Sequence, residues 1–176
     1  MSAATIIRPS RETDVAAIAA IYGHHVRHGL ASFEEVPPAV EEVARRRAEI
    51  VGRGLPYLIA ECDGSVAGYC YASLFRPRSA YRFTLEDSIY IDPALTGRGI
   101  GRALLQAVLQ QSEALGYRQM VAVIGGSETV PSIGLHRALG FANVGMLPAV
   151  GFKFGRWVDI VLMQRPLGAG AEGPPE

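Results

Sequence analysis

The stretch that decides the fold runs from Ile91 to Gly116 and reads IDPALTGRGIGRALLQAVLQQSEALG. A strand-like run ends in a cluster of glycines, Gly97, Gly99 and Gly101, and the chain continues with helical periodicity. Glycines destabilise a helix, so three within five positions at a helix start indicate that bare backbone is needed there. Free N–H groups and the helix dipole make such a start an anion site.

Two common anion loops fit this stretch poorly. A Walker A loop ends in Gly-Lys-Ser/Thr, whereas this chain has Gly101, Arg102 and Ala103. A dinucleotide loop reads G-x-G-x-x-G within a βαβ unit, but here the pattern is G-x-G-x-G and follows a predicted antiparallel hairpin. The anion is therefore predicted to belong to neither kind of nucleotide site.

Composition predicts one globular domain that needs no metal. The chain has 176 residues, of which 49% are hydrophobic, and its 17 basic and 17 acidic side chains cancel. No overall field would draw it to nucleic acid or to an anionic membrane. Cys62 and Cys70 lack CxxC spacing and nearby histidines, so we expect reduced core residues. With no signal pattern and no long apolar run, we expect a cytoplasmic location.

Periodicity predicts an α/β domain in the order β-α-α-β-β-β-α-β-α-β-β over residues 1–165, followed by a flexible Gly/Pro-rich tail at 166–176. The predicted strands cover residues 5–9, 55–62, 66–75, 84–91, 118–124, 140–147 and 154–167. The predicted helices cover residues 14–26, 39–51, 101–115 and 132–139.

The glycine cluster also carries a family resemblance. TGRGIG, Thr96 to Gly101, is similar to the acetyl-CoA loop [QR]-x-x-G-x-[GA] of the GCN5-related N-acetyltransferases (GNAT), with Thr96 where Gln or Arg is usual. SFEEVPP, FRPRSAYRFTLEDSIYI, VAVIGG, PSIGLHRALGF and GFKFGRWVDIVLMQ resemble, in order, the phosphinothricin and methionine sulfoximine acetyltransferases. The resemblance implies the GNAT fold, a mixed and mostly antiparallel sheet of about seven strands with about four helices.

Acetyl-CoA is the acetyl donor that the resemblance implies. Its pantetheine arm would pair with the strand that precedes the loop, as an added strand would. A family asparagine that bonds this arm is replaced here by Thr129, or Glu128 takes its place if the preceding loop is one residue longer. The implied cofactor contacts are Ile89, Tyr90, Ile91, Thr96, Gly97, Arg98, Gly99, Ile100, Gly101, Arg102, Thr129 and Ser132.

Acetyl transfer to an amine needs a base for the ammonium group and stabilisation of the departing thiolate. Glu86 is the candidate base, although it could instead only bind the ammonium, and His136 is the candidate acid by resemblance. Strand alternation separates two sets of side chains on opposite faces: Glu86, Ser88 and Tyr90 against Asp87, Ile89 and Ile91.

Substrate selection is expected to fall to the loop LFRPRSAYRFT, whose arginines suit a carboxylate or phosphinate. The resemblance favours Arg76 for that role and gives no support to Arg78. It also implies that the GFKFGRWVD hairpin helps form a homodimer. The candidate substrate contacts are Phe33, Arg76, Tyr81, Arg82, Glu86, Asp87, Ser88, Lys153 and Trp157.

The resulting hypothesis is an acetyl-CoA-dependent N-acetyltransferase for the α-amino group of small L-amino acids or analogues, with direct transfer in a ternary complex. Two alternatives stay open at this point. The amine could be a protein N-terminus or a polyamine, or the chain could be a catalytically silent acyl-CoA sensor.

Overall fold

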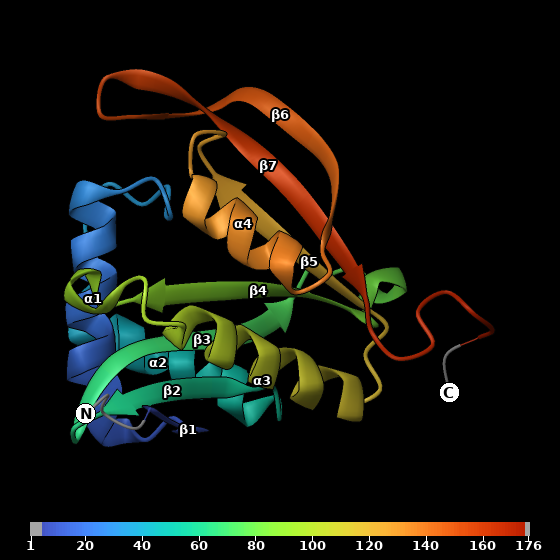
Figure 1. Ribbon diagram of the computed structural model, residues 1–176, viewed down its shortest axis with the longest axis horizontal. Helices are drawn as coiled ribbons and strands as arrows, with labels where there is room; N and C mark the ends of the chain where they lie inside the picture. The colour runs from blue at the N-terminus through green and yellow to red at the C-terminus, as the bar shows by residue number, and fades with distance from the viewer. Residues whose placement is uncertain (1–4, 175–176) are drawn as a thin grey trace.

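A computed structural model describes residues 5–174 of the chain and has seven strands and four α-helices (Figure 1). The strands are β1 (Thr5–Pro9), β2 (Tyr57–Cys62), β3 (Ser65–Leu74), β4 (Thr84–Ile91), β5 (Gln119–Gly125), β6 (Ala142–Lys153) and β7 (Arg156–Pro166). The helices are α1 (Val15–His28), α2 (Val40–Gly52), α3 (Ile100–Ala114) and α4 (Val130–Ala138). The predicted order and the mixed α/β class are confirmed.

One sheet contains all seven strands in the order β1-β2-β3-β4-β5-β7-β6. Every neighbouring pair is antiparallel except β4 and β5, which run parallel. These two strands pair only over Thr84–Asp87 and Gln119–Ala122, and then they separate. Their separation leaves the later part of β4 bonded to β3 on one side only, which opens a gap in the middle of the sheet.

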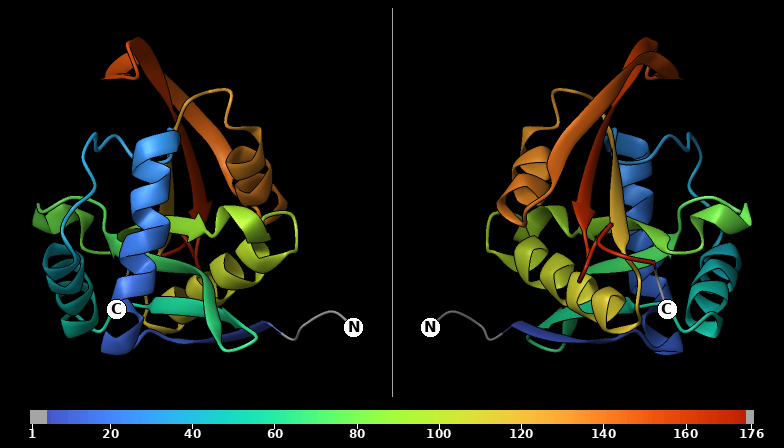
Figure 2. Two further views of the ribbon diagram at one scale, coloured as in Figure 1. Left: turned by 90° about the vertical axis from the view of Figure 1, so that its left-hand side faces the viewer. Right: turned by 90° about the vertical axis from the view of Figure 1, so that its right-hand side faces the viewer.

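The helices cover both faces of the sheet: α1 and α2 lie on one side, and α3 and α4 on the other (Figure 2). On α3, the apolar positions expected from helical spacing are fully buried, among them Leu104, Leu105 and Val108. Each such side chain contributes about 1.5–3 kcal/mol of transfer free energy. A second cluster joins α1 and α2 to tyrosines of the sheet.

β6 is longer than the sequence indicates, because it continues past Pro148 to Lys153 rather than ending at residue 147. A bulge accommodates the proline, and the register with β7 shifts between Leu147 and Gly151. Within the bulge the Ala149 N–H donates to the Asp159 carboxylate at 2.8 Å. The local bond to a side chain replaces the ladder bonds that the bulge interrupts.

The chain after β7 lies against the body of the domain. Leu167 is buried, and the Arg118 guanidinium donates to the carbonyls of Gly170 and Glu172 at 2.8 and 2.7 Å. The expected boundary at residue 166 therefore falls at the end of a strand that continues into packed chain, and flexibility of 166–176 stays a prediction. Residues 1–4 of the expected domain and 175–176 of the expected tail lie outside the described residues.

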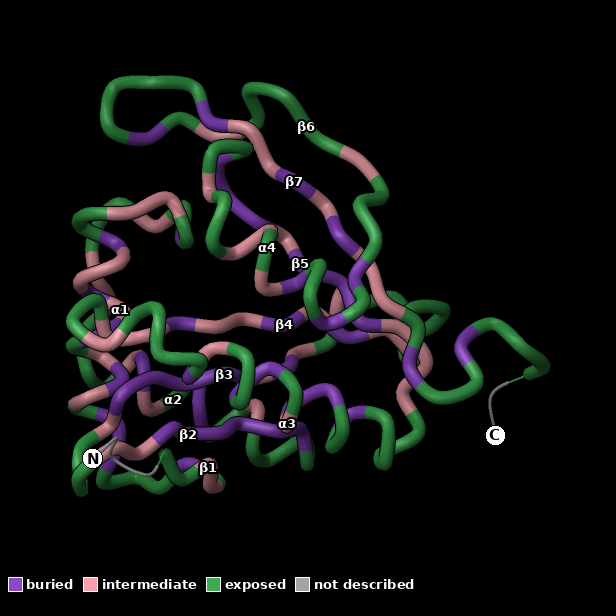
Figure 3. The backbone as a smooth tube through the Cα atoms, in the orientation of Figure 1, coloured by how far each residue is buried: buried purple, intermediate pink, exposed green. Residues whose placement is uncertain are grey.

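The outer part of the β6–β7 hairpin is mostly exposed, whereas the central strands are buried (Figure 3). Among residues 5–174, none of the helices combines the length and the apolar character that crossing a bilayer requires.

Candidate active site

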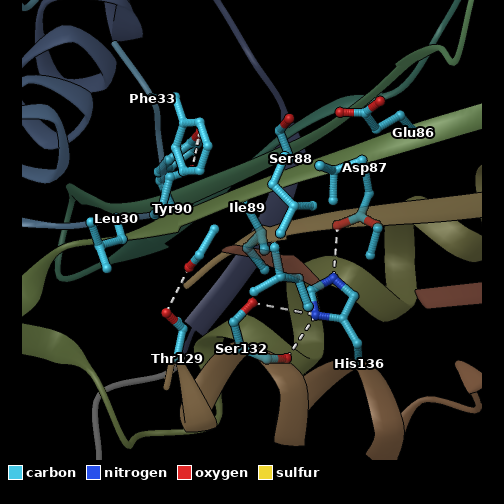
Figure 4. A pocket seen from close by; sticks show the side chains of 16 residues that line it. Leu30, Phe33, Glu86, Asp87, Ser88, Ile89, Tyr90, Thr129, Ser132 and His136 are labelled. Atoms are coloured by element: carbon cyan, nitrogen blue, oxygen red, sulfur yellow. Dashed lines mark hydrogen bonds and ion pairs between the residues drawn. The ribbon is translucent and has the colours of Figure 1, made fainter. Parts of the chain in front are cut away.

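A pocket of about 280 Å³ lies where β4 and β5 separate (Figure 4). It brings together residues from the loop after α1, from β4 and from α4, far apart in sequence. Nine of the predicted site residues line it: Phe33, Glu86, Asp87, Ser88, Ile89, Tyr90, Thr129, Ser132 and His136. The gap in the sheet thus positions both sequence-predicted catalytic residues in one cavity.

Glu86 lies on β4 opposite Val121 of β5, one residue before the pairing of the two strands ends. Burial, together with the neighbouring charge of Asp87, raises the pKa of its carboxyl to about 7, although Arg76 acts in the opposite direction. Among the described residues its carboxyl has no hydrogen-bond partner, and it points away from His136 (Figure 4). A half-buried carboxyl of this kind exchanges a proton near neutral pH.

Asp87 points to the opposite face and contacts His136 of α4. Its Oδ2 lies 3.0 Å from Nε2 of the ring, and both side chains are 2% exposed. The other ring nitrogen, Nδ1, is 2.7 Å from the backbone oxygen of Ser132. Burial alone would lower the pKa of His136, but the hydrogen bond and charge of Asp87 outweigh it, so the pKa is raised.

The three glycines of the loop have two different roles. Gly97 and Gly99 have φ of 75° and 79°, and a Cβ built on either would meet nothing within 4 Å. The backbone there is left-handed and uncovered. Gly101 is already inside α3, where a Cβ would lie 3.3 Å from Leu135, so it permits close packing against the helix that follows.

Thr129 and Glu128 differ in where their side chains lie. Thr129 lines the pocket and donates its hydroxyl hydrogen to the Gly125 carbonyl at 2.7 Å. Glu128 is exposed and pairs with Arg156 at 2.7 Å, outside the pocket lining. Of the two candidates for the missing asparagine, Thr129 is therefore the one inside the pocket.

The model for the acetyltransferase (GNAT) domain matches residues 7–162. This chain belongs to the GNAT acetyltransferase family. The match covers all of the sheet except the first residues of β1 and the last of β7, together with the glycine loop and every pocket-lining residue named above.

Individual relatives agree over nearly the whole chain. The phosphinothricin N-acetyltransferase of Alcaligenes faecalis is 55% identical over 98% of this chain and 88% of its own length. The L-methionine sulfoximine/L-methionine sulfone acetyltransferase of Salmonella typhimurium is 38% identical over 92% of this chain and 94% of its own. The crystal structure of a GNAT superfamily phosphinothricin acetyltransferase from Sinorhizobium meliloti, in complex with AcCoA, has a TM-score of 0.95. It is 49% identical and covers 100% of this chain and 94% of its own.

The arginine-bearing loop of this acetyltransferase lies outside the pocket lining. Arg76 lies over the Phe75 ring at 5.1 Å, and Arg82 lies over Phe83 at 4.6 Å while bonding the Ser79 carbonyl. Tyr81 packs edge-on against Phe75 and does not line the pocket. Arg76 nevertheless acts on Glu86 through its charge. The substrate roles of these side chains stay predictions.

Lys153 and Trp157 also lie outside the pocket lining of the acetyltransferase. Lys153 is 2% exposed and donates to the carbonyls of Gly29 and Ser32 at 2.9 and 2.5 Å. It thereby ties the β6–β7 hairpin to the loop that carries Phe33. Trp157 is 66% exposed, so its side chain faces outward from the same hairpin.

Sequence reasoning missed several pocket-lining residues: Leu30, Ala31, Ala122, Val123, Ile124, Gly125 and Ile160. They carry apolar side chains or no side chain, so no chemical signal separates them from core residues. Gly125 alone gives a hint, since a Cβ there would collide with the Leu30 carbonyl. Within residues 5–174, no group of three or more His, Cys, Asp or Glu side chains is arranged to hold a metal ion.

Proposed function

We propose that this GNAT acetyltransferase moves the acetyl group of acetyl-CoA to the α-amino group of a small L-amino acid or an analogue such as phosphinothricin or methionine sulfoximine. The observation that carries the proposal is Glu86, a half-buried carboxyl with a pKa of about 7 at the gap between β4 and β5, which has no hydrogen-bond partner within residues 5–174. The names of the relatives support the choice of amines.

Acetyl-CoA is proposed to bind along the gap between β4 and β5, with its pyrophosphate at the start of α3. The uncovered backbone at Gly97 and Gly99 offers N–H groups to its pyrophosphate at the positive end of the α3 dipole. The free edge of β4 beyond Asp87 offers backbone groups to the pantetheine arm, as an added strand would. Thr96, Arg98, Ile100 and Arg102 would complete the loop contacts.

The ionisable groups in the pocket support direct transfer. Glu86 accepts a proton from the ammonium group, which leaves a neutral amine to attack the thioester carbonyl. His136, through the raised pKa that Asp87 gives it, supplies a proton on the sulfur side. Cys70 lies near Asp87 but is fully buried, and burial raises its thiol pKa well above the usual value, which disfavours an acyl-cysteine.

The substrate carboxylate is proposed to bind Arg76, with Arg82 and Tyr81 on the same loop. Arg76 is exposed on the loop before β4 and its charge lowers the pKa of Glu86, which supports a role in binding the anionic end of an amino acid whose amine meets Glu86. Phe33 and Ser88 would line the amino-acid side of the pocket.

A two-fold homodimer is proposed through the β6–β7 hairpin. Its exposed apolar side chains include Phe152, Phe154 and Trp157, with exposed fractions of 56%, 55% and 66%. Such a patch on one element is typical of an interface. Sedimentation of the wild type and of Trp157→Glu tests this, and a monomeric wild type would contradict it.

Steady-state acetylation of methionine sulfoximine, phosphinothricin and the common amino acids tests the reaction. Double-reciprocal plots for the two substrates should intersect, because both must be bound before transfer. Parallel lines would contradict direct transfer. Turnover of a polyamine or a protein N-terminus with none on amino acids would contradict the substrate class, and acetyl-CoA binding without any turnover would favour a sensor.

A further inference from the structure

A chain of hydrogen-bonding groups crosses the floor of the pocket from Asp87 through His136 to Ser132 (Figure 4). Nε2 of His136 is 3.0 Å from Asp87 Oδ2, and Nδ1 is 2.7 Å from the Ser132 carbonyl oxygen. The Ser132 hydroxyl oxygen is 3.5 Å from the same Nδ1. All three residues line the pocket, and the two ionisable side chains are 2% exposed.

The hydrogen bonds of Asp87, His136 and Ser132 require one more proton than a neutral imidazole and a carboxylate would carry. A carbonyl oxygen can only accept, so Nδ1 of His136 must carry a hydrogen that it donates to Ser132. Nε2 then faces Asp87 Oδ2, and a neutral ring would set two acceptors against each other. One additional proton between Nε2 and Oδ2 is needed to make that bond.

The surroundings protect this proton from water. The Phe141 ring packs edge-on against His136 with centroids 5.0 Å apart, and the buried thiol of Cys70 lies near Asp87. The raised pKa of His136 agrees with a ring that stays charged in this position. The pair therefore stores a proton beside the pocket.

Neither ring nitrogen of His136 is free to reach a ligand, because Asp87 occupies Nε2 and the Ser132 carbonyl occupies Nδ1. The Ser132 hydroxyl is the next group along the chain. Its oxygen lies 3.5 Å from Nδ1, so it can share the Nδ1 hydrogen with the carbonyl. It is also half-buried and lines the pocket, so it can donate its own hydrogen into the cavity.

We propose that the Ser132 hydroxyl delivers the proton stored by Asp87 and His136 to the sulfur of the departing coenzyme A. This inference rests on the proposed acetyl transfer and refines it. It makes Ser132 the residue that touches the leaving group, and it makes His136 the proton source behind it. Asp87 is a positioning residue that keeps the ring charged.

The amine nitrogen forms a bond to the acetyl carbon, and the carbon–sulfur bond breaks with its electron pair on sulfur. Sulfur takes the hydrogen of Ser132 Oγ, and Oγ takes the Nδ1 hydrogen of His136, which is left neutral with its Nε2 hydrogen bonded to Asp87. The amine nitrogen gives one proton to Glu86 and a second to water, and water recharges His136.

Nitrogen NMR of the ligand-free protein tests the stored proton without any catalysis. Near neutral pH the wild type should give imidazolium shifts for both ring nitrogens of His136. Asp87→Asn keeps the contact, because the amide donates to Nε2, but it should leave a neutral ring protonated at Nδ1. A neutral ring in the wild type, or a charged ring in Asp87→Asn, would overturn the proposal.

Leaving-group dependence tests delivery. With acetyl-CoA, Ser132→Ala and Asp87→Asn should lower kcat by about 10²-fold or more, the usual contribution of a positioned acid. With the acetyl thioester of 4-nitrothiophenol, whose thiolate leaves without a proton, the same variants should stay within a few-fold of wild type. Equal losses with both donors would show a structural role and refute delivery.

Ser112→Ala is the matched control, because Ser112 is a fully buried serine on α3 outside the pocket lining. Its rates with both donors and its His136 spectrum should equal those of the wild type. A wild type inactive with both donors would refute the proposed acetyl transfer and the delivery with it, while the NMR spectrum would still decide whether the proton is stored.

Discussion

Glu86 and Asp87 are consecutive carboxylates on β4 that lie in opposite environments. Glu86 shares a strand face with Tyr90, which packs in the cluster beneath α1 and α2. The Glu86 carboxyl has no hydrogen-bond partner among the described residues. Asp87 faces α4, is 2% exposed and bonds His136 at 3.0 Å. The alternation of a strand is enough to place two chemically similar groups on opposite sides of one pocket.

This difference separates two proton tasks. Burial without a hydrogen-bond partner raises the pKa of Glu86 to about 7, so part of the carboxyl is deprotonated near neutral pH and can accept a proton from the substrate. Asp87 has a buried partner, the His136 ring, and its hydrogen bond and charge raise the pKa of that ring. Titratable groups whose environments diverge in this way are typical of acid and base assignments in one active site.

Glu86→Gln is expected to have the largest effect on catalysis, because it removes the candidate base. The amide cannot accept the ammonium proton, so kcat near neutral pH should fall by about 10²- to 10⁴-fold while acetyl-CoA affinity changes little. Steady-state rates and acetyl-CoA titration measure the two quantities. Glu41→Gln, an exposed change on α2, is the control. Full activity of Glu86→Gln at every pH would rule out Glu86 as the base.

Asp87→Ala is expected to lower the free energy of unfolding more than Glu86→Ala does. Removing the carboxylate leaves the buried His136 without its partner, and breaking a buried pair costs about 3–5 kcal/mol of unfolding free energy. Glu86→Ala should cost less, because no partner is lost. Urea denaturation of both variants gives the free energies. Equal losses for the two would contradict the contrast in environment.

The pH dependence of the wild type should show the ionisation of Glu86. Burial raises its pKa, so the active carboxylate form exists above pH about 7, and kcat/KM should fall as the pH drops through that value. This acidic limb of the pH profile, the fall of kcat/KM as the pH drops, should be absent from the residual activity of Glu86→Gln. A limb that persists in that variant would assign the ionisation to another group.

Arg76→Gln should have the smallest effect, a shift in the pH at which kcat/KM falls. The Arg76 charge lowers the pKa of Glu86, so its loss should move the limb to higher pH, by less than about one unit for an exposed charge. High salt should move the wild-type limb in the same direction and leave Arg76→Gln almost unchanged. A shift to lower pH would contradict the predicted influence. A raised KM for the amino acid would support carboxylate binding.

The elements that carry local signals could be predicted from the sequence. Gly97 and Gly99 indicated uncovered backbone before α3, and the alternation of β4 placed Glu86 and Asp87 on opposite faces. The end of β6 could not be predicted, because Pro148 is typical of a strand end and only pairing with Asp159 and β7 holds the bulge in place.

Contacts across the fold also escaped sequence reasoning. The ammonium group of Lys153 bonds the carbonyls of Gly29 and Ser32, more than a hundred residues away, and its substrate role stays a prediction. Gly101 was grouped with the other two glycines, although its bare Cα serves packing against Leu135. A single sequence gives no distance between segments, so partners of this kind have no signature.

The sequence by itself determined the element order and the strand alternation that separates Glu86 from Asp87, because periodicity and capping act over a few residues. It also predicted the anion loop and the candidate base Glu86, and the family resemblance added His136. Tertiary structure alone decided that β4 and β5 separate after Asp87, that α4 brings His136 against that carboxylate, and that both His136 and Ser132 line the pocket. The physical reason is that a proton's position depends on which donors and acceptors are buried together, and burial is a property of the packed chain.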